Sequence, residues 1–468
     1  MNPGNSKTVF ERSATWVVLT FVVSLFLFHL YVIHKYAVEI PIIDDWAMFR
    51  PDRPAKLSVA WLLDTSNTRT TASEHVIATT KLFVWMQYHL NQWNIHVNLI
   101  LNFLIFGFLV GWMVWFADKA VPEIPRYAKL AFAIFLLSPI DWFNHFMATQ
   151  TCYLFYMILF FLGSYVLFRD TQRWWHIVAG SLLSVLSIYS LASGFGSCLV
   201  LLSAFCVFKG ARIYSKNHAA PLSHEATQLA VTICLIGGGL ALWLAHYATP
   251  AHVELVFPND RRFWQFFVNL VSFGFGIETY SSWWGTFCLL VVLVPICAII
   301  WKRKGRLTGI EWACFVMVAG ILVNVAQIAL GRAYPGVETG SKVLRYVEFV
   351  LPLIPLSMIA WAILWRDRKR AQAIILGGLF GFCLLTFAND WSFDSYKYEA
   401  LRRTEGRACV KAYYKGIGDG RCPTLYVDRQ VNIPLATWLD NAKAVNVYFY
   451  QNLSEEIETE NQPQPEAR

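Results

Sequence analysis

Charged residues are scarce in this 468-residue sequence: Asp, Glu, Lys and Arg make up 15% of it, while 56% of the residues are hydrophobic. A soluble protein of this length needs a charged surface around two or three domains, so the composition excludes that class. Apolar runs recur along most of the chain, and they reach the ~18 residues that cross a ~30 Å hydrocarbon core. The sequence therefore predicts a membrane protein that crosses the bilayer many times.

Motifs that bind nucleotides or transition metals are also missing. The sequence has no GxxxxGK[ST] phosphate loop, no GxGxxG after a strand, no HExxH and no paired Cys/His spacing. Ionisable residues lie at the ends of the apolar runs, whereas ion-coupled transporters usually carry them at the membrane midplane. These absences argue against a nucleotide-dependent enzyme, a zinc enzyme and an ion-coupled transporter. They leave open a hard divalent cation, Mg or Mn, held through oxygen.

Apolar segments indicate an all-α bundle of about eleven transmembrane helices. We expect these at residues 13–33, 94–117, 127–140, 151–168, 176–192, 195–208, 226–248, 283–301, 309–330, 347–365 and 371–388. No small-residue cleavage site follows the first segment, so it is expected to stay as an anchor. An amphipathic stretch at 78–93 is expected to lie along the interface or dip into it.

Basic residues gather in every second connection between these segments. They lie around residues 119–129, 169–173, 209–216, 302–306 and 366–370. Because positive connections are retained in the cytoplasm, we expect these connections and the N-terminus on that side. This pattern explains the net charge of +8 without a nucleic-acid partner. The longer connections, 34–93 above all, are then outside, and any chemistry belongs to the outer face.

The C-terminal part is more polar and is expected on the outer side. We divide the chain into a membrane domain at 1–388, a small extracytoplasmic segment at 389–455 and a disordered, acidic tail at 456–468. Most of the ten cysteines fall in or beside apolar runs, where they act as small hydrophobic residues. Cys409 and Cys422 lie in the polar segment instead. Outside the cytoplasm, a disulfide between them is expected.

Two adjacent acids stand out in the first outer connection, within the stretch EIPIIDDWAMF at 39–49. Asp44 and Asp45 are either solvated loop acids, capping a short helix, or a functional pair. In a functional pair, one carboxylate accepts a proton while the other positions it. Two carboxylates also suit a cation.

The same connection carries a second polar group in the stretch SEHVIATTK at 73–81. Glu74 and His75 precede the amphipathic stretch, and Lys81 lies one or two turns into it. These residues are either a polar rim or a site for an acceptor substrate or a hard cation. The pattern alone does not separate the two interpretations.

Three cations lie in the connection GRAYPGVETGSKVLRYVEF at 331–349: Arg332, Lys342 and Arg345. Outer connections are otherwise poor in basic residues, so this group needs an explanation. Lipid head groups are one; a specific phosphate site is the other, since a guanidinium fork matches phosphate oxygens. Glycines in this connection let the backbone approach a ligand closely.

A short outer turn, SPIDWFNHFMATQTCY at 138–153, is rich in polar and aromatic residues. Asn144, His145 and Gln150 are able to hydrogen-bond a sugar, and each is also able simply to tie the turn together. Trp and Tyr are common at membrane interfaces and add little to this choice.

Taken together and in this order, these motifs resemble the GT-C class of polytopic glycosyltransferases, and more closely its large, mostly uncharacterised bacterial group. In that class a carboxylate in the first outer loop acts as catalytic base, and Asp44 and Asp45 occupy that place. The bacterial group often shows Asn-Glu-His-Arg later in this loop, where this sequence has Ser73-Glu74-His75-Val76.

Two later motifs extend the resemblance. An aromatic-Asn turn followed by Gln is similar to Trp142, Asn144 and Gln150. A Gly-Arg pair followed by Ser-Arg-Tyr is similar to Gly331-Arg332 and Leu344-Arg345-Tyr346, with Leu in place of Ser.

The resemblance implies a cell-envelope enzyme of the bacterial cytoplasmic membrane, acting in polysaccharide biosynthesis. It would move a sugar from a polyprenyl-phosphate-linked donor to an extracytoplasmic glycan, lipid or protein. Nucleotide sugars are cytoplasmic, so an outer-face transferase needs such a donor. Asp44 or Asp45 would be the base, and Arg332, Lys342 and Arg345, with Tyr346, would bind the donor phosphate. Two alternatives remain: a polymerase or ligase of the O-antigen type, and a non-enzymatic flippase for lipid-linked sugars.

Overall fold

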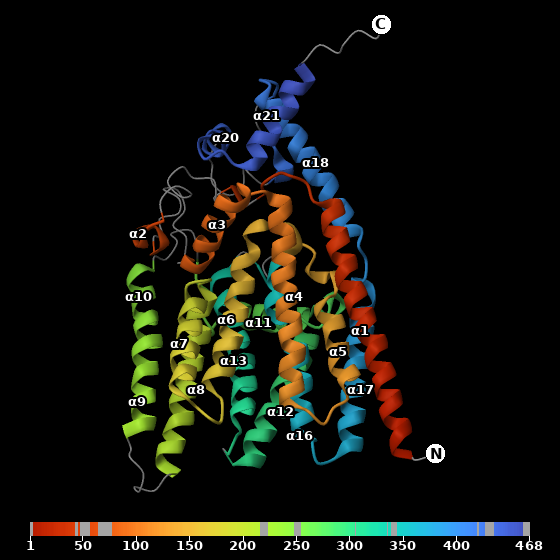
Figure 1. Cartoon of the computed structure of the whole chain (residues 1–468), viewed down its shortest axis with the longest axis vertical. Coiled ribbons are helices and arrows are strands. Elements are labelled where there is room, and N and C mark those ends of the chain that lie inside the picture. Colours follow the sequence, from red (N-terminus) through yellow and green to blue (C-terminus); the bar gives the residue numbers. More distant parts are fainter. Residues whose placement is uncertain are drawn as a thin grey trace.

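The computed structural model describes residues 3–42, 45–46, 57–63, 77–215, 223–247, 254–304, 306–334, 336–337, 344–418, 421–425 and 435–461. Within these ranges the chain is built of helices and contains no β-strand. The long helices stand side by side, with the start of α1 at one end of the bundle and α21 at the other (Figure 1).

Nine spans within the described residues are long and apolar enough to cross a membrane. They are formed by α1 (Pro3–Tyr36), α4 (Ile95–Ala120), α6 (Thr151–Leu167), α8 (Ser193–Ser215), α9 (Ser223–Thr232) with the π turn η5 (Ile233–Gly237) and α10 (Gly238–His246), α12 (Ser282–Arg303), α13 (Gly309–Arg332), α15 (Val347–Val350) with α16 (Leu353–Leu364), and α17 (Lys369–Thr386). This is the architecture of an all-α, multi-pass membrane protein.

Two of the eleven predicted segments form shorter helices. α5 (Arg126–Leu136) has 11 residues and α7 (Trp174–Ile188) has 15. α5 ends before Pro139, since a proline disfavours helical conformation in the residue before it. The chain continues from there in three 3₁₀ turns, η2 (Pro139–Asp141), η3 (Asn144–Phe146) and η4 (Ala148–Gln150).

Small residues let α6 and α7 pack closely. A Cβ atom added to Gly163 would lie 2.7 Å from Ser184 Oγ and 3.2 Å from the backbone oxygen of Gly180. Helices in a membrane associate through such close approaches, because lipid tails are as apolar as the side chains themselves. This close approach holds α6 against α7.

Several connections between the spans contain helices of their own. α2 (Val59–Leu63) and α3 (Ala78–Asn91) lie in the first connection. α11 (Arg261–Phe273), which the sequence analysis did not predict, begins at Asp260, whose carboxylate accepts the Arg262 N–H at 2.8 Å. Phe263, Phe266 and Leu270 are buried along one face of α11. Short turns η6 (Ile277–Thr279) and η8 (Ala388–Asp390) follow further on.

The C-terminal segment forms a cap at the same end of the molecule as α3 (Figure 1). It consists of α18 (Asp394–Tyr414), η9 (Pro423–Leu425), α20 (Leu435–Ala444) and α21 (Tyr448–Asn461). Cys409 and Cys422 are joined by a disulfide. The Tyr448 N–H donates to the Gln92 carbonyl at 2.8 Å, which ties α21 to the end of α3.

One boundary differs from the sequence-based expectation. The tail was expected to be disordered from residue 456, but α21 continues to Asn461. Acidic residues in this last part, Glu456 and Glu460, face basic residues of α18, and Lys415 Nζ lies 2.5 Å from Glu460 Oε2. An acidic stretch becomes helical here because α18 supplies its counter-charges. Residues 462–468 lie outside the described residues.

Candidate functional site

The turn at 139–150 forms the centre of the candidate site. Its polar residues are buried, and neighbouring helices hold its backbone. Asn102 on α4 donates from Nδ2 to the carbonyls of Met147 and Ala148, at 3.1 and 3.0 Å, and its Oδ1 accepts the Thr151 hydroxyl at 2.5 Å. The asparagine therefore fixes where the turn ends and α6 begins.

Asp45 reaches this turn from the first connection. Its Oδ1 accepts the Thr149 N–H at 3.0 Å, and its Oδ2 accepts the Ile42 N–H at 3.4 Å. The side chain is 0% exposed. Beside it, Trp46 packs against Trp438 of α20 and Phe449 of α21, with ring centroids 6.4 and 5.6 Å apart. The second residue of the acidic pair is therefore anchored between the turn and the C-terminal cap.

The first connection is fixed a second time at Glu39. Its carboxylate accepts the N–H groups of Ile95 and His96, at 3.0 and 3.2 Å, at the start of α4. Carboxylates are favourable at helix N-termini, where the first N–H groups have no partner within the helix. The connection is thus held at both Glu39 and Asp45.

The basic motif meets the same turn from the other side. Asn144 Nδ2 donates to the Arg345 carbonyl at 3.1 Å and to Asp141 Oδ1 at 2.5 Å. Arg345 lies in the 3₁₀ turn η7 (Leu344–Tyr346), and its guanidinium is 5.3 Å from the centre of the Tyr346 ring. Asn144 thus joins the 139–150 turn to the start of α15.

The other predicted residues are distributed as follows. Gln150 lies in the turn and donates to Met147 Sδ at 3.1 Å. Lys81 on α3 donates to the Trp61 carbonyl at 2.9 Å, so it ties α3 to α2. Arg332 is the half-buried last residue of α13. Asp44, Glu74, His75 and Lys342 lie outside the described residues.

Sequence analysis missed the contribution of α18. Arg403 is 0% exposed and donates to the Phe146 carbonyl in the turn and, from Nε, to Glu399 Oε1 at 3.0 Å. Tyr396 OH forms a hydrogen bond of 2.5 Å with His145 Nδ1. The spacing of Glu399 and Arg403, four residues apart on a helix, was the available signal, but it is equally typical of exposed helix pairs.

Burial dominates the electrostatics of this site. It raises the pKa of Asp45 to about 6, although the positive charge of Arg403 and the bonds to Thr149 and Ile42 act in the opposite direction. Burial also raises the pKa of Asp141 and lowers the pKa of His145. Both groups therefore favour their neutral forms, while Asp45 changes charge near neutral pH.

Several buried polar atoms near the turn have no hydrogen-bond partner within the part of the chain that the structure describes. They include Asp141 Oδ2, Asn144 Oδ1 and Glu348 Oε2. A carboxyl oxygen accepts a hydrogen bond when ionised and donates one when protonated, and the asparagine oxygen accepts, so these atoms suit a polar ligand. No group of three or more His, Cys, Asp or Glu among the described residues is arranged to hold a metal ion.

These features define a multi-pass membrane protein with a buried polar site at one end of its helical bundle. The site is built from the first connection, the 139–150 turn, the 344–350 segment and the C-terminal cap. No family model, curated protein or solved structure matches this chain.

Proposed function

We propose that this protein is a membrane glycosyltransferase of the GT-C type. It transfers a sugar from a polyprenyl-phosphate-linked donor to a glycan, lipid or protein acceptor outside the cytoplasm. One observation carries the proposal: Asp45, the 139–150 turn and Arg345 are far apart in the sequence, yet two hydrogen bonds join them. These bonds are Thr149 to Asp45 and Asn144 to Arg345.

Asp44 and Asp45 have different roles in the proposed mechanism. Asp45 is enclosed, and both of its oxygens accept backbone N–H groups. Such a carboxylate suits a positioning role, because it holds the connection on the turn. The proposal therefore assigns the role of general base to its neighbour Asp44. Asp44 removes the proton from the acceptor hydroxyl as the new glycosidic bond forms. General-base assistance of this kind contributes about 10²–10⁴-fold to the rate.

The basic motif serves the donor. The C1–O bond of the donor sugar breaks, and the electron pair leaves with the polyprenyl phosphate. Arg332, Lys342 and Arg345, with Tyr346, bind that phosphate and stabilise its charge. Glu74 and His75 orient the acceptor or a divalent cation. Lys81, assigned to the same group by sequence, is engaged at the α2–α3 contact.

Membrane placement follows from the distribution of basic residues. Connections such as α12 to α13 and α16 to α17 lie at the end of the bundle where α1 begins, and α18–α21 lie at the opposite end (Figure 1). The proposal places the first end in the cytoplasm of a bacterium and the second outside its cytoplasmic membrane. Polyprenyl-linked donors are then available to the site.

Complementation of a deletion strain tests the proposal. Surface-glycan masses are compared in strains carrying the wild type, Asp44→Asn or Asp45→Asn at equal expression. The wild type is expected to restore a mass difference equal to a sugar residue, and both variants are expected to fail. Full restoration by both variants would contradict a carboxylate-dependent transferase. It would favour a polymerase or ligase, or a flippase that moves lipid-linked sugars without forming glycosidic bonds.

A further inference from the structure

Arg403 and Asp45 attach to the same short turn from opposite ends of the chain. The guanidinium of Arg403 donates to the Phe146 carbonyl, and Asp45 accepts the N–H of Thr149, three residues later. Both side chains are 0% exposed. Their opposite charges attract each other, and because both groups are buried, solvent screens that attraction less than at the surface.

The charges around Arg403 balance only when Asp45 is ionised. Glu399 already has a complete partner in Arg402, which donates from Nε and Nη2 at 2.8 and 2.7 Å. A second positive charge remains on Arg403, and its Nη1 has no hydrogen-bond partner within the described ranges. A buried charge without a counter-charge is costly. Of the described residues, Asp45 is the other acid that acts on Arg403, and it is able to supply that counter-charge.

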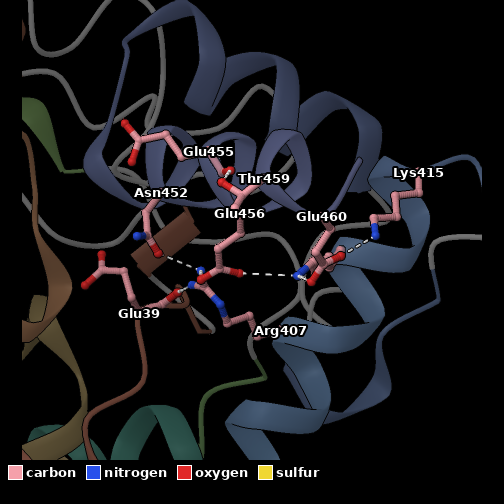
Figure 2. Close-up of polar contacts among 9 residues, drawn as sticks. Glu39, Arg407, Lys415, Asn452, Glu455, Glu456, Thr459 and Glu460 are labelled. Carbon is pink, nitrogen blue, oxygen red and sulfur yellow. Dashed lines mark hydrogen bonds and ion pairs between the residues drawn. The ribbon is translucent and has the colours of Figure 1, made fainter. Parts of the chain in front are cut away.

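One turn further along α18, Arg407 holds the start of the first connection at Glu39. It donates to the backbone carbonyl of Glu39, and its Nη2 donates to Asn452 Oδ1 and Glu456 Oε1, at 2.6 and 2.7 Å. Figure 2 shows this arginine between the connection on one side and α21 on the other. α18 therefore contacts the first connection at Glu39 through Arg407. The charge of Arg403, on the same helix, acts on Asp45 in that connection.

We propose that Arg403 is a positioning residue of the site: it keeps Asp45 ionised and holds the 139–150 turn beside it. The C-terminal segment, which contains α18, then contributes to the function of the site. This inference rests on the proposed function for its catalytic meaning. Among the described residues, Glu39 on the same connection also interacts electrostatically with Asp45, and Glu399 and Arg402 on α18 interact with Arg403.

An infrared pH titration tests the proposal without any need for turnover. The carbonyl band of protonated carboxyl groups is followed against pH in the purified full-length protein, and the part lost in Asp45→Asn belongs to Asp45. Arg403→Met is expected to move the midpoint of that part upward by about one pH unit or more, since a nearby opposite charge shifts a carboxyl by that amount. Arg403→Lys, which keeps the charge, is expected to restore most of the wild-type midpoint.

Two further variants keep the test decisive if Arg403→Met folds poorly. Glu399→Gln removes a negative charge beside Arg403, so the midpoint is expected to move downward. Lys411→Met removes a positive charge from the exposed part of α18 and is expected to leave the midpoint unchanged. An unchanged midpoint in both Arg403→Met and Glu399→Gln would overturn the proposal.

Sugar transfer measured on the same preparations separates this inference from the proposed function. Transfer by the wild type with no shift in the Arg403 and Glu399 variants would leave the function standing and overturn the role of Arg403. The expected shifts with no transfer by any preparation would support the counter-charge and contradict the transferase.

Discussion

The two halves of α18 carry similar charged residues in different surroundings. In the first half, Glu399 and Arg403 face the interior, with side chains 2% and 0% exposed. In the second half, Lys411 pairs with Glu460 of α21, and these side chains are 21% and 50% exposed. The first set reaches the candidate site at the Phe146 carbonyl. The second set fastens α21 to α18, and Figure 2 shows the neighbouring contact of Lys415 with Glu460.

This difference shows which ion pairs the molecule depends on. Breaking a buried pair leaves an uncompensated charge and typically costs about 3–5 kcal/mol. An exposed pair contributes about 0–1 kcal/mol, because water screens it and two long side chains must be ordered. The number of ion pairs on α18 is therefore a poor guide to its stability; the burial of each pair is a better one.

The largest effect is expected for Arg403→Met. Loss of the buried guanidinium leaves Asp45 without its nearby positive charge and the Phe146 carbonyl without this donor, so the free energy of unfolding should fall by about 3–5 kcal/mol. Thermal unfolding in detergent measures this, with Lys411→Met as the control on the exposed half. Equal effects of the two substitutions would remove the distinction between the two halves.

A pH dependence is the next largest effect. The pKa of Asp45 is about 6, so the residue is ionised above that pH and neutral below it. Ionised Asp45 holds the first connection on the 139–150 turn in the proposed mechanism, so transfer should be present above pH 6 and fall about tenfold for each pH unit below it as Asp45 becomes protonated. Initial rates between pH 4.5 and 8 check this prediction. In Asp45→Asn, any residual rate should not show this fall as the pH is lowered through 6.

The same titration affects stability in the opposite direction. The folded-state pKa of Asp45 lies above its ordinary value of 3.8, so folding favours the protonated form. The stability contributed by this proton is present below pH 4 and is lost as the pH rises through 6. Unfolding of wild type and Asp45→Asn across this range should show the difference; parallel curves would contradict it.

A smaller effect is expected for Arg407→Ala. This change removes hydrogen bonds to the Glu39 carbonyl, Asn452 and Glu456, and charged hydrogen bonds contribute about 1.5–3 kcal/mol each when buried. Partial exposure reduces that figure here. Hydrogen exchange should become faster in α21 and in residues 37–42. Exchange that increases in neither segment would show that Arg407 does not join them.

The smallest effect is expected for Glu460→Gln. Lys411 and Lys415 hold the pKa of this exposed carboxyl near 2. Removing the charge should change the midpoint of thermal unfolding little, and the remaining difference should shrink in high salt, because exposed pairs are screened. A loss as large as that of Arg403→Met would contradict the comparison of the two halves.

Local patterns in the sequence predicted the membrane spans well, because each span carries its own apolar run. They predicted α5 and α11 poorly. α5 stops early at a proline-containing turn, and α11 has a buried face that depends on packing against α12 and α13. The helical end of α21 was also missed, since its counter-charges lie on another helix.

Long-range packing also limited what the sequence could predict about the site. Asp45, Asn144 and Arg345 were singled out from the sequence, and the structure brings them to one turn. Arg403 was not singled out, because nothing local distinguishes a buried arginine from an exposed one at a helical spacing from Glu399. Its place is set by long-range packing of α18 on the 139–150 turn.

The most direct test of the account is an in vitro transfer assay. Purified protein is mixed with lipid-linked sugars and acceptor material extracted from the deletion strain, and acceptor masses are measured. The account predicts that the wild type adds a mass equal to one sugar residue, and that Asp44→Asn and Asp45→Asn, folded to the same extent, do not. Undiminished transfer by both variants would contradict it.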